Sequence, residues 1–398
     1  MMANLSHKTC VRIGLMCSTT GSYQSIGQAM LCGALLAIER VARDPRFTFC
    51  FEPEVVNPGG DLTQYYAQTQ ALLDSGIRHV VGCYTSSSRK EVLPLFERRD
   101  GLLWYPSHYE GFECSDNVIY VGASPNQHIV PLISYLMNTV GKRAYCVGSN
   151  YVWPWESNRV MREILEANDG DVVCERYLPI GSTDVEQIID EVQRLKPDFV
   201  FSSLIGESGQ AFVAAYGQAV NTQRISASTP LASCTLSEEE LKAVDASVRA
   251  GHICSSVYFQ SIGTQANAEF VRDIKQRYGV QQVTSADAEA SFIAVLLLAE
   301  AIHLADTDDV QQVRSAAVQS RLNAPQGPVW IDPENHHCYL TPRLGISNAN
   351  GDFEILASAK EPRKPDPYLT WLDMGKVGDG AVMEDHGDRL KPELRIVR

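Results

Sequence analysis

Hydroxyl-bearing side chains gather in this sequence behind two short apolar runs, at residues 79–82 and 102–105. In chain order they are Tyr84, Thr85, Ser86, Tyr105 and Ser107. A hydroxyl both donates and accepts hydrogen bonds, and an aromatic ring supplies an apolar wall. These residue types suit a small amide or urea-like ligand, which needs donors for its carbonyl and acceptors for its NH2 group. Helix capping by Ser and Thr, with tyrosines in the core, is the alternative interpretation of the same residues.

The elements that must position these hydroxyls are two strands of a parallel sheet. Each apolar run predicts a buried strand, and the segment between them, with Val92, Leu95 and Phe96 on its inner face, predicts a helix that begins near residues 86–88. The carboxyl ends of parallel strands meet at one edge of a sheet, where small ligands bind. We therefore expect the hydroxyls to converge there with the first backbone N–H groups of the helix.

Motifs for covalent or metal chemistry are weak. Residues 206–209, Gly-Glu-Ser-Gly, are one residue short of a GxSxG nucleophile elbow, and we find neither a P-loop nor a GxGxxG fingerprint. Cys83 follows a predicted strand, but no Glu–Lys partner set accompanies it, which favours a buried thiol over a nucleophile. His336 and His337 are adjacent on a predicted strand, so their side chains should face opposite ways. We predict a non-catalytic chain without a metal or a cofactor.

The charge of the chain argues against nucleic acid as a direct partner. Its 398 residues carry a formal net charge of −14, whereas phosphate binding requires a basic face. The length suits two domains. No run of 18 apolar residues occurs, which predicts no membrane span.

Cysteine usage and the first residues predict a compartment. Eleven cysteines with irregular spacing and no CxxC pair are typical of reduced core thiols. Residues 1–8 are polar, and no basic segment with a following apolar core is evident. We expect a cytoplasmic location, or a periplasmic one if a signal peptide has been removed.

Strand and helix patterns alternate along most of the chain. They predict one doubly wound α/β unit up to residue 124 and a second one to residue 230, whose last strand lies near 225–230. Further on, two alternating runs flank the turn Asn348-Ala349-Asn350-Gly351 and predict a hairpin. The Pro-, Asp- and Gly-rich residues 366–398 predict an extended C-terminal tail.

Several segments resemble the AmiC-type amide sensors, a branch of the type I periplasmic-binding-protein (Leu-binding-protein-like) family close to the urea and short-chain amide receptors of ABC transporters. The matching segments occur in family order over nearly the whole chain. They are GCYTSSSRKEVLPLFE from residue 82, YPSHYEGFE from 105, VGASPNQ from 121, GSNYVWPWESN from 148, ASCTLSEEEL from 232, NAPQGPV from 323, DPENHH from 332 and KPDPY from 364.

The resemblance implies an architecture. The fold class is α/β, with two doubly wound lobes of parallel sheets that are joined by a three-strand hinge and close over the ligand. Residues 1–124 and 255–331 would form the N-terminal lobe, and residues 125–254 and 332–365 the C-terminal lobe.

The resemblance also adds ligand-binding candidates from the second lobe. They are Tyr151, Trp153, Ile205, Gly206 and Thr235. The family has tyrosine at Trp153 and threonine at Ser107, so we expect a preference shifted towards another small amide, urea or an aromatic amide. Glu207 is the nearest acid on this rim, and we interpret it as a solvated residue at a helix start, which favours a neutral ligand.

The implied function is that of a sensor which regulates amidase or nitrile-degradation genes by holding an ANTAR-type antiterminator protein while the ligand is absent. The alternative is the substrate-binding receptor of an ABC transporter for urea, amides or branched-chain amino acids. A symmetric homo-oligomer is a further expectation of the analogy.

Overall fold

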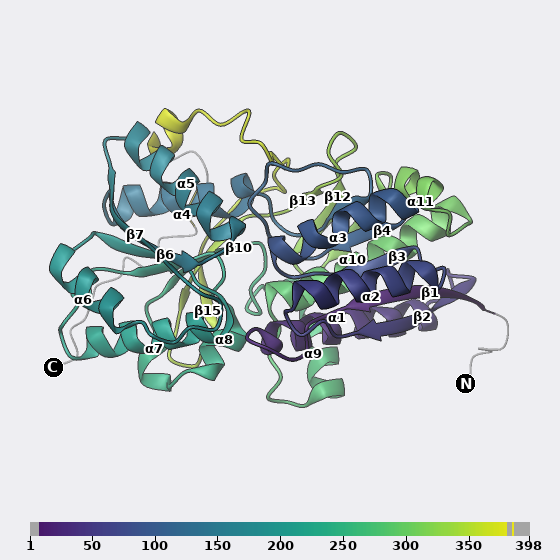
Figure 1. The fold of residues 1–398 in the computed structure, drawn as a ribbon, viewed down its shortest axis with the longest axis horizontal. Coiled ribbons are helices and arrows are strands. Elements are labelled where there is room, and N and C mark those ends of the chain that lie inside the picture. Colours follow the sequence, from purple (N-terminus) through teal and green to yellow (C-terminus); the bar gives the residue numbers. More distant parts are fainter. Residues whose placement is uncertain (1–7, 380–383, 386–398) are drawn as a thin grey trace.

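The computed structural model describes residues 8–379 and 384–385, and two α/β lobes lie side by side in it (Figure 1). The first lobe is built on a five-stranded parallel sheet in the order β2-β1-β3-β4-β5. Its strands are β1 (Thr9–Met16), β2 (Phe49–Val56), β3 (His79–Gly82), β4 (Leu102–Tyr105) and β5 (Val118–Tyr120). Every residue of the inner strands β3 and β4 is buried, as expected for parallel strands that helices cover on both faces, and so is every residue of the edge strand β5.

Helices from both ends of the chain cover this sheet. They are α1 (Gln24–Arg43), α2 (Leu62–Asp74), α3 (Ser86–Arg99), α9 (Gln265–Tyr278), α10 (Ala286–Ala305) and α11 (Val310–Ala317). In Figure 1 the green helices α10 and α11 lie with the purple and blue elements of the first hundred residues. Asp61 caps α2 as its position before an amphipathic segment indicates, because its carboxylate accepts from the N–H of Thr63 at 2.7 Å.

The second lobe is built on an eight-stranded sheet in the order β16-β15-β14-β10-β9-β8-β6-β7. The pairs from β7 to β10 are parallel, and the pairs from β10 to β16 are antiparallel. The strands are β6 (Arg143–Ser149), β7 (Asp171–Leu178), β8 (Phe199–Ser203), β9 (Leu231–Ser233), β10 (Ile253–Ser256), β14 (Arg343–Ser347), β15 (Phe353–Ser358) and β16 (Glu384–Asp385). The helices are α4 (Pro125–Thr139), α5 (Val152–Ala167), α6 (Glu186–Leu195), α7 (Gly206–Asn221) and α8 (Glu238–Ala243), with the short 3-10 helix η1 (Ala246–Val248).

A small antiparallel sheet of β11 (Arg321–Ala324), β12 (Gly327–Ile331) and β13 (Cys338–Tyr339) completes the structure. The arrangement confirms the predicted α/β fold with two lobes and parallel sheets. The hairpin predicted at 348–351 is confirmed as well, since β14 and β15 pair in antiparallel register around it. The residue boundaries of the lobes stay a prediction.

Three local predictions were wrong. The strand expected near 225–230 is a turn that ends at Pro230, and the strand β9 begins after that proline, which has no N–H to give to a ladder. The patterns predict helices over residues 156–167 and 210–220, but α5 and α7 each begin four residues earlier. Pro154 does not delay α5, because proline fits the first turn of a helix. Trp153 therefore lies in a helix and not in an aromatic turn.

The predicted extended tail is also wrong for its first part. The Asp366 carboxylate accepts from the N–H groups of Thr370 and Trp371, and the 3-10 helix η2 (Met374–Asp379) packs against α4 and α5. The hydroxyl of Ser134 donates to the carbonyl of Val377 at 2.7 Å. Residues 380–383 and 386–398 of the predicted tail lie outside the described residues.

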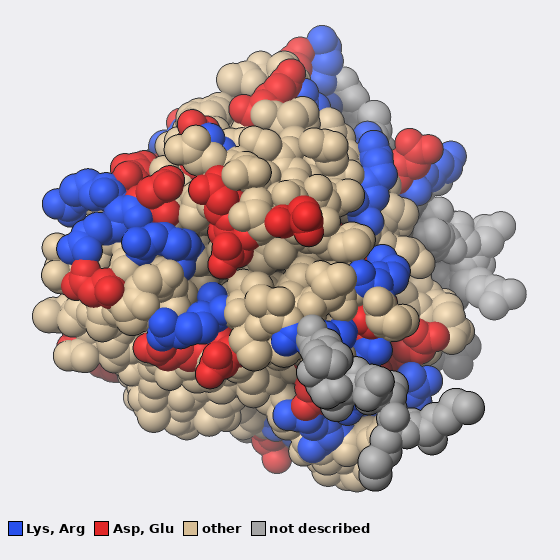
Figure 2. Space-filling model, turned by 90° about the vertical axis from the view of Figure 1, so that its right-hand side faces the viewer, with Lys and Arg blue, Asp and Glu red and all other residues tan. Residues whose placement is uncertain are grey.

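Two helices, α1 and α10, are long and apolar enough to cross a membrane by length and composition alone. They pack against each other, and 56% and 72% of their apolar stretches are buried inside the structure. The core helices of a folded domain have the same properties. On the face in Figure 2 acidic and basic side chains are interspersed, with no basic stripe of the kind that phosphate backbones require.

Candidate functional site

The two lobes touch across the cleft that separates them. His108 follows β4 in the first lobe and Trp153 lies in the first turn of α5 in the second, and their ring centroids are 5.0 Å apart in an edge-to-face arrangement. The structure is therefore that of a closed cleft.

The predicted hydroxyls lie at the carboxyl edge of the first sheet, but most of those with a hydrogen bond pair with other groups of the same lobe. The Tyr105 hydroxyl donates to the carbonyl of Tyr84 at 2.8 Å. Thr85 is the N-cap of α3 and accepts from the N–H of Ser88 at 3.1 Å. Thr85 thus has the capping role that was the alternative interpretation of this cluster.

Ser86 has a partner that sequence reasoning missed. Its hydroxyl donates to the carboxylate of Glu110, and both residues are buried. Glu110 lies in a segment already matched to the amide sensors, YPSHYEGFE, so its membership of that segment was the available signal. A buried carboxylate next to Ser86 adds a strong acceptor for N–H groups to this part of the cleft.

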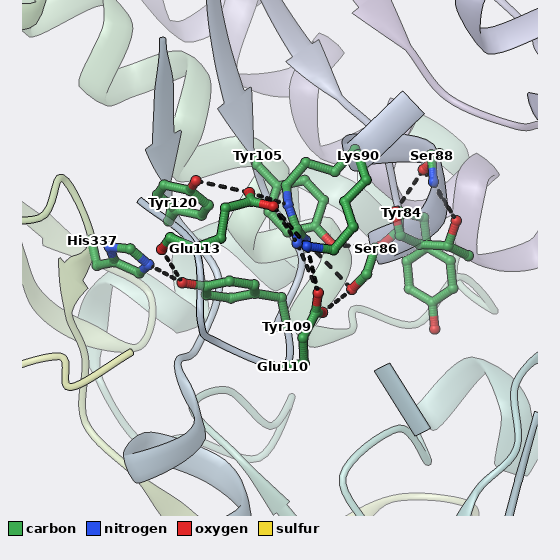
Figure 3. Close-up of polar contacts among 12 residues, drawn as sticks. Tyr84, Ser86, Ser88, Lys90, Tyr105, Tyr109, Glu110, Glu113, Tyr120 and His337 are labelled. Atoms are coloured by element: carbon green, nitrogen blue, oxygen red, sulfur yellow. Dashed lines mark hydrogen bonds and ion pairs between the residues drawn. The ribbon is translucent and has the colours of Figure 1, made fainter. Parts of the chain in front are cut away.

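A buried arginine, Arg89, holds this acceptor in place, and Figure 3 shows the carboxylates and rings of this cluster, among them Glu110, Glu113, Tyr105 and Tyr109. The Arg89 side chain has no solvent exposure and forms ion pairs with Glu110 at 3.0 Å and Glu113 at 2.7 Å. Its guanidinium lies 4.8 Å from the centroid of the Tyr105 ring and 4.7 Å from that of Tyr109. Burial raises the pKa of Glu113, but the charge and hydrogen bond of Arg89 outweigh it and hold that pKa at about 2.

The second lobe contributes aromatic and backbone groups. Tyr151 is the N-cap of α5, and burial, followed by the nearby Tyr105 and Glu110, raises its pKa well above the ordinary value. Trp153 is buried, and its Nε1 has no hydrogen-bond partner. The N–H of Ile205 donates to the Ser149 hydroxyl at 3.2 Å, so this N–H already has a partner in its own lobe.

Of the two remaining predicted hydroxyls, one has a hydrogen-bond partner and the other does not. The Thr235 hydroxyl donates to the carbonyl of Leu204 at 3.1 Å. The Ser107 hydroxyl is buried without a partner. Gly206, at the start of α7, faces Ser22 of the first lobe.

Two adjoining cavities of about 20 Å³ each, room for about one water molecule, lie at the hinge side of the cleft. Both are lined by residues of the two lobes, and they share His108, Cys234, Ser256, Ala286 and Asp287. Thr235 lines one of them, and the other nine predicted site residues line neither. Sequence reasoning missed Asp287, because an acid in the first turn of a helix has an ordinary explanation in the helix dipole. Glu207 is exposed in the first turn of α7, as expected of a solvated residue at a helix start, but Asp287 brings an acid to the cleft from the first lobe, so the geometry does not support the expectation of a neutral ligand.

The residues weighed for chemistry are unsuited to it. Burial raises the pKa of the Cys83 thiol to about 12, so it is protonated and a poor nucleophile. His337 is buried between Tyr109 and the backbone of Asn335. Among the described residues, no group of three or more His, Cys, Asp or Glu side chains is placed to hold a metal ion.

Comparisons with known proteins agree with this architecture. A solute-binding protein of an ABC transporter from R. palustris, solved in complex with benzoate, superposes with a TM-score of 0.80 at 16% identity, over 90% of this chain and 98% of that one. The branched-chain amino acid transporter substrate-binding protein of Streptococcus pneumoniae, in complex with isoleucine, superposes with a TM-score of 0.75 at 17% identity, over 90% and 100%. These likenesses establish the fold.

One curated relative matches a short stretch only. Limonene hydroxylase of Geobacillus stearothermophilus is 33% identical over 122 residues, which are 30% of this chain and 22% of that protein. A family model described as periplasmic binding protein domain matches residues 11–373, nearly the whole of the chain. This chain therefore belongs to the periplasmic binding protein domain family.

Proposed function

We propose that the chain is a non-catalytic receptor that closes its two lobes on a small solute and serves as the substrate-binding component of an ABC uptake system. One observation carries the proposal: cavities in the closed cleft are lined from both lobes and bordered by buried polar atoms without partners, such as Ser255 Oγ and Gln326 Oε1. Buried polar groups are normally paired, so their exceptions call for a partner from outside the chain. The solved relatives that are solute receptors support the same role.

The ligand class that we propose is a short amide, urea or related nitrogen compound. The Ser86 hydroxyl and the Glu110 carboxylate offer acceptors for N–H groups, and the unpartnered Ser107 hydroxyl offers a donor or an acceptor. Trp153 adds a flat wall with a free N–H donor, which suits an aromatic amide. The relative in complex with benzoate is consistent with an aromatic body in a cleft of this fold.

The location that we propose is the periplasm or its equivalent outside the cytoplasmic membrane. Uptake receptors meet their solute there, and the family description favours that location over the cytoplasmic one expected from the first residues.

A cytoplasmic amide sensor is the second candidate function. The segments quoted above, among them GCYTSSSRKEVLPLFE and GSNYVWPWESN, favour it through their resemblance to AmiC-type regulators. In that case the chain would hold an ANTAR-type antiterminator protein and release it when the ligand closes the cleft.

The binding proposal is tested by thermal unfolding of the purified chain with a ligand panel. The panel holds acetamide, propionamide, butyramide, benzamide, urea, formamide, benzoate, leucine and glutamate. A ligand at about 100 times its Kd adds about 2.7 kcal/mol of stability, which is readily measured. We expect stabilisation by at least one amide or by urea. Stabilisation by leucine or glutamate alone would replace the ligand class, and no stabilisation by any compound would count against the binding site.

Transport and regulation are separated by deleting the gene in its native host. For a receptor, uptake of the labelled ligand falls in the deletion strain and the protein is found in the exported fraction. For a sensor, uptake is unchanged, the protein is found in the cytoplasm, and ligand-induced transcription is lost.

A further inference from the structure

The carboxylate of Asp287 lies in the cleft without a partner. Its side chain is 8% exposed and lines both cavities at the hinge side. Among the described residues, none forms a hydrogen bond or an ion pair with this carboxylate; the hydroxyl of Ser291 donates instead to the main-chain carbonyl of Asp287. Both carboxylate oxygens of Asp287 are thus available to accept hydrogen bonds from a ligand.

Helix capping does not account for Asp287. The N-cap of α10 is Ser285, whose hydroxyl accepts from the N–H of Ala288 at 3.3 Å. Ser285 thus makes the side-chain cap of α10, and the Asp287 carboxylate accepts from none of the N–H groups at this end but lines the cavities instead. Burial raises the pKa of Asp287 to about 7, which reflects the cost of a carboxylate without a counter-charge.

The polar groups that line the cavities with Asp287 supply no positive charge: His108 lines both cavities, and burial lowers its pKa to about 4, so its imidazole is neutral. Gln326 uses its Nε2 to donate to Glu289 at 2.9 Å, which leaves its buried Oε1 without a partner beside the cavity. Ser255 Oγ is likewise buried and unpartnered. Neither cavity has a Lys or Arg among its lining residues, and Glu238 lines one of them. The nearby Arg343 does not line either cavity. Its guanidinium donates to the main-chain carbonyls of Gln326 and Val257.

We propose that Asp287, Gln326 and Ser255 form a subsite for a protonated nitrogen group, such as an amidinium or ammonium, at one end of the ligand. The inference rests on the proposed function, because it names the charge of the solute that the receptor carries. A planar amidinium presents several N–H donors, which match the Asp287 carboxylate and the free Gln326 Oε1, and its charge offsets the buried carboxylate. The cavity volume of about 20 Å³ accommodates the end of a ligand and not its whole body, so this subsite lies beside the Ser86–Glu110 region and does not replace it.

The test compares isosteric pairs that differ in charge: acetamide with acetamidinium, and benzamide with benzamidinium. Affinities are measured by calorimetry on the wild-type chain, on Asp287→Asn, and on Asp169→Asn, an exposed aspartate at the far end of α5 that serves as the matched control. We expect the wild type and Asp169→Asn to bind one amidinium at least tenfold more tightly than its neutral partner. Asp287→Asn should lose that preference while its affinity for the neutral amide changes less than about threefold. Unchanged or increased thermal stability of Asp287→Asn will show that the variant is folded.

The outcomes separate this inference from the proposed function. Binding of a neutral amide without any preference for its amidinium, or a preference that survives in Asp287→Asn, overturns the cation subsite and leaves the receptor in place. Binding of none of the four compounds to the wild type overturns the cation subsite, and it overturns the proposed function as well if no compound of the ligand panel stabilises the chain.

Discussion

The backbone N–H of Glu207, in the first turn of α7, donates to the carbonyl of Ser22 in the first lobe at 3.0 Å. This hydrogen bond joins the two lobes directly. It forms because Gly206 adopts a φ of +57° and has no side chain: a Cβ at this position would lie 2.1 Å from the Ser22 carbonyl oxygen. Gly206 therefore controls how closely the lobes approach each other.

Gly206→Ala should oppose closure. The added methyl group collides with the Ser22 carbonyl, and the lobes can relieve that collision only by opening. We expect ligand affinity to fall at least about tenfold, or about 1.4 kcal/mol, and the radius of gyration with ligand to stay near its ligand-free value in X-ray scattering. Gly251→Ala is the control, since Gly251 has a φ of +91° but nothing lies within 4 Å of the place that an added methyl group would take. The Gly251→Ala variant should lose only the stability that the backbone strain costs, about 1–2 kcal/mol. Equal binding by the two variants would mean that this contact is not part of the ligand-bound state.

Ser86→Ala and Tyr105→Phe should each weaken binding of the best amide or urea-like ligand by roughly 0.5–3 kcal/mol, because each change leaves a buried polar group without its partner. In the first variant that group is Oε2 of Glu110, whose Oε1 stays paired with Arg89, and in the second it is the Tyr84 carbonyl. Calorimetry on the purified variants measures the effect. Ser87→Ala and Tyr216→Phe are the matched controls; Tyr216 donates to the Thr229 carbonyl at 2.7 Å, away from the cleft. If both site variants bind the ligand as tightly as their controls do, the ligand does not contact this cluster.

Arg89→Met should strongly destabilise the fold. The change removes the buried counter-charge of the Glu110 and Glu113 carboxylates and leaves them only the part-exposed Lys90, at 3.5 and 3.0 Å; breaking a buried pair typically costs about 3–5 kcal/mol. Arg99→Met is the control, because Arg99 is 42% exposed and pairs with the exposed Asp74, an interaction that contributes about 0–1 kcal/mol. Unfolding in guanidinium chloride gives both values. Similar midpoints for the two variants would show that the buried network adds no more than a surface pair.

The stability of the ligand-free chain should fall as the pH rises from 6.5 to 8.5. Burial raises the pKa of Glu238 and Glu240 from 4.5 to about 8, and that of Glu289 from 4.5 to about 7. Asp287, which faces Glu240 across the cleft, is raised to about 7. The folded state thus binds protons more tightly than the unfolded state does. The free energy of unfolding therefore falls as the pH rises towards the folded-state pKa values of these carboxyls.

Thermal unfolding should show a midpoint at pH 8.5 that is lower than at pH 6.5 by roughly 2 °C or more, the shift expected for about 1 kcal/mol. Glu240→Gln should reduce this dependence. The lowest pH compared is 6.5, because two buried histidines reverse the trend below it. Burial lowers the pKa of His108 to about 4 and that of His128 to about 3, so the unfolded state binds protons more tightly at these residues and acid destabilises the fold. A midpoint that rises from pH 6.5 to 8.5 would contradict the assignment of the raised pKa values to these acids.

The elements of the fold follow closely from local sequence. The apolar runs that become β3 and β4, the capping aspartate Asp61 and the hairpin turn after β14 each depend on a few neighbouring residues. Periodicity and capping act over about two turns of helix, so a single sequence contains them in full. Where the prediction failed, as at the start of α5, the first turn of the helix holds Trp153 and Pro154, and apolar periodicity does not mark that turn.

The site depended on the tertiary structure to a much greater degree. The sequence by itself determined that hydroxyls would follow two neighbouring strands, because the carboxyl ends of parallel strands share an edge. It could not determine that Glu110 and Arg89 would occupy part of that space, or that Asp287 would be left without a partner. In sequence Asp287 is one more acid at a helix start. Its isolation exists only because α10 returns to the first lobe and the second lobe closes over it, which removes the water that would otherwise solvate its charge.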